Sequence, residues 1–177
     1  GSSTAWLLTV GPTGAVDPES FVHSKFIVIW ACNSISTNLH HWPFVLEAQK
    51  RGAKVVVIDS FKSRTAKAGD WHICPKPGTH GAVAMGFIHS IIEQGLVDQD
   101  YVDKYTYGYP ELQARAADFT PDYVESVTGV KAADIAKFAR EFATAQPSVI
   151  RLGVALERSA GGAQAIRAAG CLPALVG

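Results

Sequence analysis

The chain is poor in charged residues, and the charges it has cancel. Only 18 % of its 177 residues are charged, and 16 basic residues balance 16 acidic ones. A nucleic-acid-binding protein would carry a basic stripe, and no apolar run here is long enough to cross a bilayer. The composition therefore argues against a nucleic-acid partner and a membrane segment. It predicts one domain, residues 1–177, that is large enough to bury a sizeable core.

Cysteine is scarce, and metal-ligand patterns are absent. Cys32, Cys74 and Cys171 are isolated, with no C-x-x-C pair, so they fit neither a disulfide framework nor an iron–sulfur ligand set. We expect reduced, packed thiols. The pair His40-His41 does not suggest a metal site, because adjacent helical side chains point about 100° apart. No metal ligand is predicted.

Familiar catalytic motifs are also missing. The sequence has no G-x-S-x-G, no H-E-x-x-H and no P-loop lysine motif, and no catalytic residue is assigned. It has no glycine between Lys25 and Arg51, where a nicotinamide dehydrogenase would carry G-x-G-x-x-G to let backbone amides approach a pyrophosphate. A nicotinamide dehydrogenase is therefore disfavoured.

What the chain does have is a series of apolar, β-branched runs separated by helical patterns. Strands are predicted at 25–32, 53–59, 70–75 and 147–153, with a further short strand at 5–10 and a loop at 11–20. Helices are predicted at 38–52, 80–94, 99–105, from 120, at 131–145 and after Gly161-Gly162. Uniformly apolar strands that alternate with helices indicate a parallel sheet covered on both faces. The predicted fold is α/β, a Rossmann-like doubly wound sheet.

In such sheets, ligands bind at the carboxyl ends of the strands. After the first strand, polar side chains at a helix start could hold a phosphate or cap the helix; they are Asn33, Ser34, Ser36 and Thr37. After the second strand, the Asp59 carboxylate can accept two ribose hydroxyls, and Ser60 adds a polar contact. Arg64 suits a phosphate or a base. The alternative for Asp59 is a turn-forming acid.

The third strand leads into "CPKPGTH", where two prolines enforce an extended path and Gly78 permits close backbone approach. Thr79, a predicted N-cap, and His80 begin the buried helix 80–94 and suit a base edge or an anion. After the fourth strand, Gly153, Glu157 and Arg158 are predicted to form a second ligand-facing loop.

With these strand ends in view, the chain resembles the molybdopterin oxidoreductase family, the dimethyl-sulfoxide-reductase-like enzymes, from about Asp17 onward. The resemblance rests on an ordered set of segments that includes "RGAKVVVIDS", "KPGTHGAVAMG" and "RLGVALERSAGG". It implies the third domain of a larger enzyme that holds molybdenum or tungsten between two pyranopterin guanine dinucleotides, of which this domain would bind one. The parent would perform a two-electron redox reaction or oxygen-atom transfer.

The resemblance also implies roles for the strand-end residues. Asn33 and its neighbours would meet the phosphate or pterin end, and Asp59 and Arg64 would address the guanosine. Residues 78–80 would lie against the guanine edge, and 153–158 would close over the cofactor near the metal. A 4Fe-4S cluster, the metal-ligating residue, the remaining domains and a possible electron-transfer subunit would lie outside these 177 residues. The parent would be a bacterial-type enzyme of the cytoplasm or periplasm.

The sequence departs from the family pattern at two places. His80 stands where the family often has an aspartate that accepts from the guanine N1–H and amino groups, and a neutral imidazole cannot make that bidentate pair. Ala31-Cys32 stands where glycine is common. The alternative hypothesis is a Rossmann-like binding or scaffold module without redox chemistry, such as the middle domain of a thiamine-diphosphate enzyme, because fold alone does not determine function.

Overall fold

The computed structural model describes residues 1–12 and 16–177. Within them, a parallel sheet has the strand order β3-β2-β1-β4, built from β1 (Phe26–Trp30), β2 (Lys54–Ile58), β3 (Trp71–Ile73) and β4 (Ser148–Leu152). The chain moves outward from β1 to β3 on one side and returns beyond β1 to form β4. The predicted parallel α/β sheet is confirmed, and its strand order reverses between β1 and β4.

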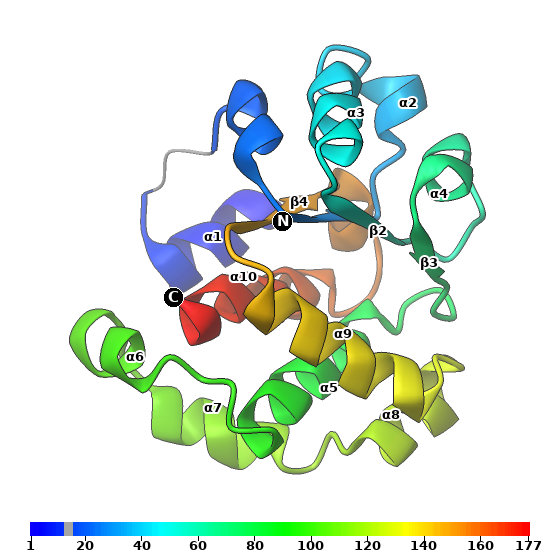
Figure 1. Ribbon diagram of the computed structural model, residues 1–177. Coiled ribbons are helices and arrows are strands. Elements are labelled where there is room, and N and C mark those ends of the chain that lie inside the picture. The colour runs from blue at the N-terminus through cyan, green and yellow to red at the C-terminus, as the bar shows by residue number, and fades with distance from the viewer. Residues whose placement is uncertain (13–15) are drawn as a thin grey trace.

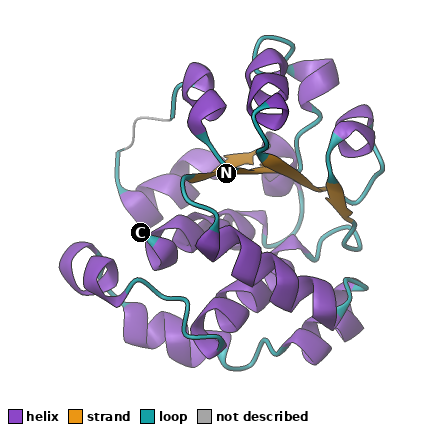
Figure 2. Ribbon diagram, viewed as in Figure 1, coloured by secondary structure: helices purple, strands orange, loops and turns teal. Residues whose placement is uncertain are grey.

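Helices cover both faces of the sheet (Figures 1 and 2). One face carries the 3₁₀ helix η1 (Pro18–His23), α2 (Ser34–Thr37), α3 (Trp42–Lys50) and α4 (Arg64–Ala68). The other carries α1 (Ser2–Val10), α5 (His80–Glu93), α9 (Ala132–Thr144) and α10 (Gly162–Val176), with α6 (Gln99–Tyr105), α7 (Tyr109–Ala116) and α8 (Pro121–Thr128) outside them. A second 3₁₀ helix, η2 (Val154–Arg158), links β4 to α10.

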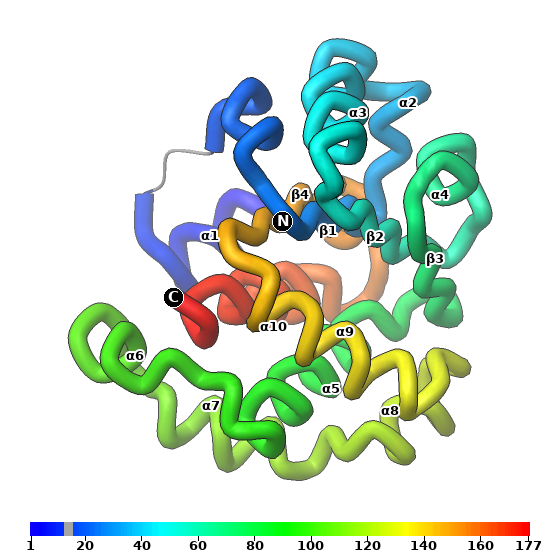
Figure 3. Tube along the Cα trace, in the orientation of Figure 1, coloured from blue at the N-terminus to red at the C-terminus, as the bar shows by residue number. Residues whose placement is uncertain are grey.

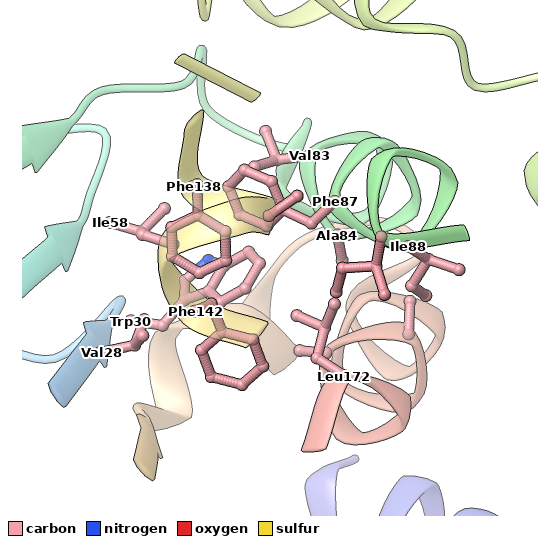
Figure 4. Close-up of a cluster of buried hydrophobic side chains, with 14 of the residues drawn as sticks. Val28, Trp30, Ile58, Val83, Ala84, Phe87, Ile88, Phe138, Phe142 and Leu172 are labelled. Atoms are coloured by element: carbon pink, nitrogen blue, oxygen red, sulfur yellow. The ribbon is translucent and has the colours of Figure 1, made fainter. Parts of the chain in front are cut away.

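Alternating strand residues feed two separate cores. Phe26, Val28 and Trp30 of β1 face the larger core under α5, α9 and α10, whereas Ile27 and Ile29 face the smaller core under α3. All five are at most 1 % exposed, which explains why the strand reads as an uninterrupted apolar run. Figure 4 shows the larger core, where the indole of Trp30 lies among side chains from β2, α5 and α9.

Helix α5 is buried as its sequence predicts. Val83, Ala84, Phe87, Ile88 and Ile91 are all fully inaccessible, because α8, α9 and α10 all pack against this helix. The tube in Figure 3 shows these segments, far apart in sequence, gathered beneath the sheet. Burial on most sides fixes the start of α5 firmly against the carboxyl edge of the sheet.

Several predictions about local structure are wrong or incomplete. Residues 5–10 form part of α1 rather than a strand, because a short apolar run does not distinguish a strand from a helix that packs one side on a core. Helices α4 and α7 were not predicted. The helix expected at 38–52 is shorter, with Pro43 in its first turn. Residues 13–15 of the predicted loop lie outside the described part of the chain.

Candidate functional site at the carboxyl edge of the sheet

The exits of the first three strands converge on His80, the first residue of α5. The indole Nε1 of Trp30, the last residue of β1, donates to His80 Nδ1 at 2.9 Å. On the other side of the ring, His80 Nε2 lies 3.2 Å from Ser60 Oγ, two residues after β2. His80 itself arrives through the segment that follows β3. One imidazole therefore ties together three strand exits.

The surroundings of His80 keep its imidazole uncharged. Burial lowers the pKa of His80, and the nearby Asp59 carboxylate opposes that shift only in part. The Asp59 Oδ1 accepts from the backbone N–H of Phe61 at 3.0 Å, which is the turn-forming role expected as the alternative. Its backbone oxygen lies 2.8 Å from His72 Nε2. Asp59 thus stabilises its own turn while remaining partly exposed.

The start of α5 differs in detail from the prediction. Gly78 has φ 80° and no heavy atom near the position of a Cβ, so glycine is required there by the backbone. Thr79 occupies the N-cap position, but its hydroxyl donates to the carbonyl of Lys76 at 2.7 Å and makes no cap bond to the helix. The first turn of α5 is therefore not capped by the Thr79 side chain.

At the exit of β1, the side chain of Asn33 is held by α4. Its Oδ1 accepts from Thr65 Oγ1 at 2.8 Å, and the same hydroxyl accepts from the backbone N–H of Ile35 at 3.1 Å. Thr65 is fully buried. Asn33 makes no side-chain cap bond to α2. The pair therefore joins the loop after β1 to the helix after β2.

Two other predicted residues of this loop also bond within the protein. Ser34 is fully buried, with its Oγ 3.5 Å from Cys32 Sγ. The hydroxyl of Thr37 donates to the backbone carbonyl of Asn33 at 3.0 Å. The first loop thus presents fewer free side-chain donors than its composition suggests.

A substitution at Thr65 tests this coupling. Thr65→Val keeps the branched shape but removes both hydrogen bonds and leaves Asn33 Oδ1 and the Ile35 N–H without their partner. We expect it to lower the free energy of unfolding by about 2 kcal/mol, measured by urea denaturation. Thr144→Val is the matched control, since its exposed hydroxyl only bonds to Arg140 within the same helix; it should change stability by less than about 0.5 kcal/mol. Equal effects of the two substitutions would refute the coupling.

The exit of β4 packs directly on the exit of β1. A Cβ on Gly153 would overlap the backbone carbonyl of Ala31 and lie 2.9 Å from Cys32 Cβ. Farther along, the Glu157 carboxylate accepts from the backbone N–H of Ser2 at 2.5 Å, and this bond lowers its pKa. Arg158 is exposed. Gly153 therefore belongs with the strand exits, whereas Glu157 is engaged by the start of α1.

A hollow of about 660 Å³ adjoins these exits. It lies between the starts of α5 and α10 and is lined on those sides by residues 78–82 and 159–161. Arg115 and Arg167 add two positive charges, and none of the described residues that line the hollow carries a carboxylate. A second hollow of about 610 Å³ lies at the opposite edge, beside Lys25 and Lys54 at the amino ends of the strands, so it is remote from the predicted site.

Contacts within the protein hold two groups of the predicted site residues together. Ser60 and His80 are in contact, with Asp59 beside them. Asn33, Ser34 and Thr37 form a bonded loop joined to α4, and Arg64, at the start of that helix, is exposed. Sequence analysis missed Trp30 and Thr65. A buried tryptophan needs an acceptor for its N–H, and that requirement was the available signal for Trp30.

The structure places the cysteines and the histidine pair that the sequence analysis singled out. The three thiols are free, although Cys74 is exposed rather than packed. His40 is exposed and His41 is buried. Among residues 1–12 and 16–177, no three histidine, cysteine or acidic side chains are grouped as metal ligands would be. In the same residues, no helix has the length and apolarity that a membrane span needs.

Comparison with known proteins decides the family. A family model described as molybdopterin oxidoreductase matches residues 11–177. The chain belongs to the molybdopterin oxidoreductase family. This confirms the resemblance drawn from the strand-end motifs and disfavours the thiamine-diphosphate alternative.

Individual relatives agree with this assignment. The chain is 37 % identical over 175 residues to the probable oxidoreductase YoaE of Bacillus subtilis, covering 99 % of this chain and 26 % of that protein. It is 35 % identical over 133 residues to formate dehydrogenase H of Escherichia coli, covering 75 % and 19 %. The solved structure of acetylene hydratase from Pelobacter acetylenicus superposes with a TM-score of 0.92 at 29 % identity, over 99 % of this chain and 24 % of that one. The chain therefore corresponds to about a quarter or less of the length of these molybdopterin oxidoreductase relatives.

Proposed function

We propose that this chain is the part of a larger molybdopterin oxidoreductase that binds one pyranopterin guanine dinucleotide at the carboxyl edge of its sheet. The observation that carries the proposal is the convergence of Ser60, His80 and the Gly153–Ala31 contact at that edge, where open α/β sheets bind ligands. The remaining domains of the parent, and an electron-transfer subunit if it has one, would contact this chain.

The residues at the edge fit a nucleotide-tailed ligand. Ser60 and Asp59 offer a hydroxyl and a carboxylate, both partly exposed, that suit the hydroxyl and base groups of a nucleoside. Gly153 packs so closely on Ala31 that no side chain fits between the two backbones, so backbone atoms form the surface at this point of the edge. Arg64 and Arg158 are exposed cations that suit the phosphates.

In this proposal the protein contributes binding and orientation. When bound, the metal–pterin group would supply two-electron redox or oxygen-atom-transfer chemistry. Asp59 accepts from ribose hydroxyls while its turn stays anchored to Phe61. His80 holds Ser60 in place, and Asn33 is held by Thr65 so that the loop after β1 keeps its shape. No residue of this chain is assigned to the chemical step.

The parent protein, purified from a host that makes the cofactor, tests the proposal. We expect molybdenum or tungsten by elemental analysis, about two pterins per polypeptide by fluorescence after oxidation, and guanosine monophosphate after acid hydrolysis. A 4Fe-4S cluster would show as iron and sulfide in the same sample. A correctly folded parent that contains neither the metal nor pterin would overturn the proposal.

A further inference from the structure

In each hydrogen bond of the His80 ring, the donor and the acceptor can be assigned. An indole N–H donates and cannot accept, so His80 Nδ1, 2.9 Å from Trp30 Nε1, must be the accepting nitrogen. In a neutral imidazole the other nitrogen then carries the proton, and Nε2–H donates to Ser60 Oγ at 3.2 Å. Both nitrogens of His80 are therefore used within the protein, and the ring offers nothing to a ligand.

The same reasoning assigns the hydrogen-bonding role of the Ser60 hydroxyl. A serine hydroxyl that accepts through its oxygen still has one proton to donate. Among the residues that the structure describes, Ser60 Oγ forms a hydrogen bond with His80 alone, and the side chain is partly exposed at the strand edge. The series of hydrogen bonds from Trp30 through His80 thus leaves the Ser60 hydroxyl as a donor that faces outward.

The charge around Ser60 selects the kind of acceptor. Burial lowers the pKa of His80 and so favours its neutral form, and the Asp59 carboxylate, on the residue before Ser60, lies close enough to act on the imidazole. The Asp59 carboxylate would repel a phosphate at Ser60, and none of Trp30, His80 and Ser60 supplies a positive charge to offset that repulsion. A neutral acceptor, such as the carbonyl oxygen of a nucleobase, meets no such penalty.

We propose that Ser60 is a specificity-determining residue that donates a hydrogen bond to a carbonyl oxygen on the nucleobase of the ligand, with His80 and Trp30 as the positioning residues that orient its hydroxyl. This inference rests on the proposed function, because it requires a nucleotide at this edge. It reverses the polarity expected from an aspartate at position 80: the protein here donates to the base instead of accepting from it.

Binding of free nucleotides to the cofactor-free parent, measured by isothermal titration calorimetry, tests the assignment. Guanosine and inosine monophosphates both carry a carbonyl oxygen at C6 and should bind within about threefold of each other, whereas adenosine monophosphate has an amino group there and should bind about tenfold more weakly. Ser60→Ala should weaken the two oxo-purines about fivefold and leave adenosine monophosphate unchanged. Ser126→Ala is the matched control and should match wild type, because Ser126 is an exposed serine on α8 whose hydroxyl donates to the Tyr123 carbonyl of the same helix.

Trp30→Phe tests whether Trp30 and His80 orient the Ser60 hydroxyl. Its readout is base selectivity, which would not change if Trp30 had only a structural role. Without the indole, the imidazole can carry its proton on Nδ1 and accept from Ser60, whose orientation is then no longer fixed. The preference for inosine over adenosine monophosphate should fall from about tenfold to about threefold or less.

The outcomes separate this inference from the proposed function. Wild-type binding with no preference for the oxo-purines, no nucleotide binding at all, or a Ser60→Ala variant with unchanged selectivity would each overturn the inference. A Ser60→Ala loss seen with guanosine monophosphate but not with guanosine would assign the contact to phosphate and also overturn it. The proposed function fails separately, if the parent made with the cofactor pathway intact contains no pterin and no metal.

Discussion

Gly153→Ala is expected to lower the melting temperature of this chain by about 6–12 °C, which corresponds to a loss of about 3 kcal/mol. The added methyl would overlap the carbonyl of Ala31, lie 2.6 Å from its carbonyl carbon and approach Cys32 Cβ at 2.9 Å. The loop after β1 cannot move away easily, because Ala31 N–H donates to Ile58 and Gly153 N–H donates to Trp30, each at 2.8 Å. The methyl must therefore separate the exits of β1 and β4.

The effect is to be measured by thermal unfolding followed by circular dichroism. Gly81→Ala is the matched control, because a Cβ there meets Ala165 at 3.6 Å, an ordinary contact. In a helix that substitution should be neutral or stabilising by up to about 1 kcal/mol. A Gly153→Ala variant as stable as Gly81→Ala would show that the two strand exits tolerate separation. Ala31 itself has φ 51°, so the strand exit already has a backbone conformation that suits glycine.

Acidification is expected to destabilise the chain through His41. This side chain is 1 % exposed, its two ring nitrogens have no hydrogen-bond partner in the described part of the chain, and its ring packs edge-on against Phe21 at 4.5 Å. Burial, and secondarily the positive charge of Arg151, lower the pKa of His41 to about 4. Because the pKa in the unfolded chain is about 6.5, the unfolded state binds a proton between pH 6.5 and 4 that the folded state does not.

The contribution of neutral His41 to the free energy of unfolding is therefore fully present above about pH 6.5. It is lost as the pH falls toward 4, by up to about 3 kcal/mol. His41→Leu removes the titrating group, so the difference in unfolding free energy between variant and wild type should grow as the pH is lowered from 7.5 to 4.5. Urea denaturation at several pH values measures it. His80 has a lowered pKa as well, and the comparison between variant and wild type cancels its contribution.

His40→Leu is the control for His41, since its side chain is exposed one residue away. It should leave the pH dependence unchanged. If His41→Leu and wild type lose stability in parallel on acidification, the buried imidazole is not the responsible group.

The sequence was informative where one physical pattern dominates. Strands β1 and β2 are buried on both faces, so every residue from Phe26 to Trp30 had to be apolar, and the run could be read directly. The helix starts at Asp98 and Thr120 were readable because their side chains bond to N–H groups three residues on. Segments with one packed side, such as α1 and α7, lacked such a signal.

The candidate site shows the same contrast between what local sequence patterns reveal and what long-range contacts decide. That polar residues would gather at the carboxyl edge follows from parallel topology, and the sequence places Asp59, Ser60 and His80 there. The sequence did not show that Trp30, a core residue by every pattern, donates to His80, or that Thr65 holds Asn33. Those bonds join residues 50 and 32 positions apart.

By itself, then, the sequence determined a parallel α/β sheet, its buried central helix and the family of the chain, since these depend on periodicity and on ordered local motifs. Only the tertiary structure decided which polar side chains form hydrogen bonds within the protein, and that the Ser60 hydroxyl keeps a proton to donate to a ligand. The physical reason is that hydrogen-bond direction depends on which donor faces which acceptor, and folding brings those partners together from separate strands.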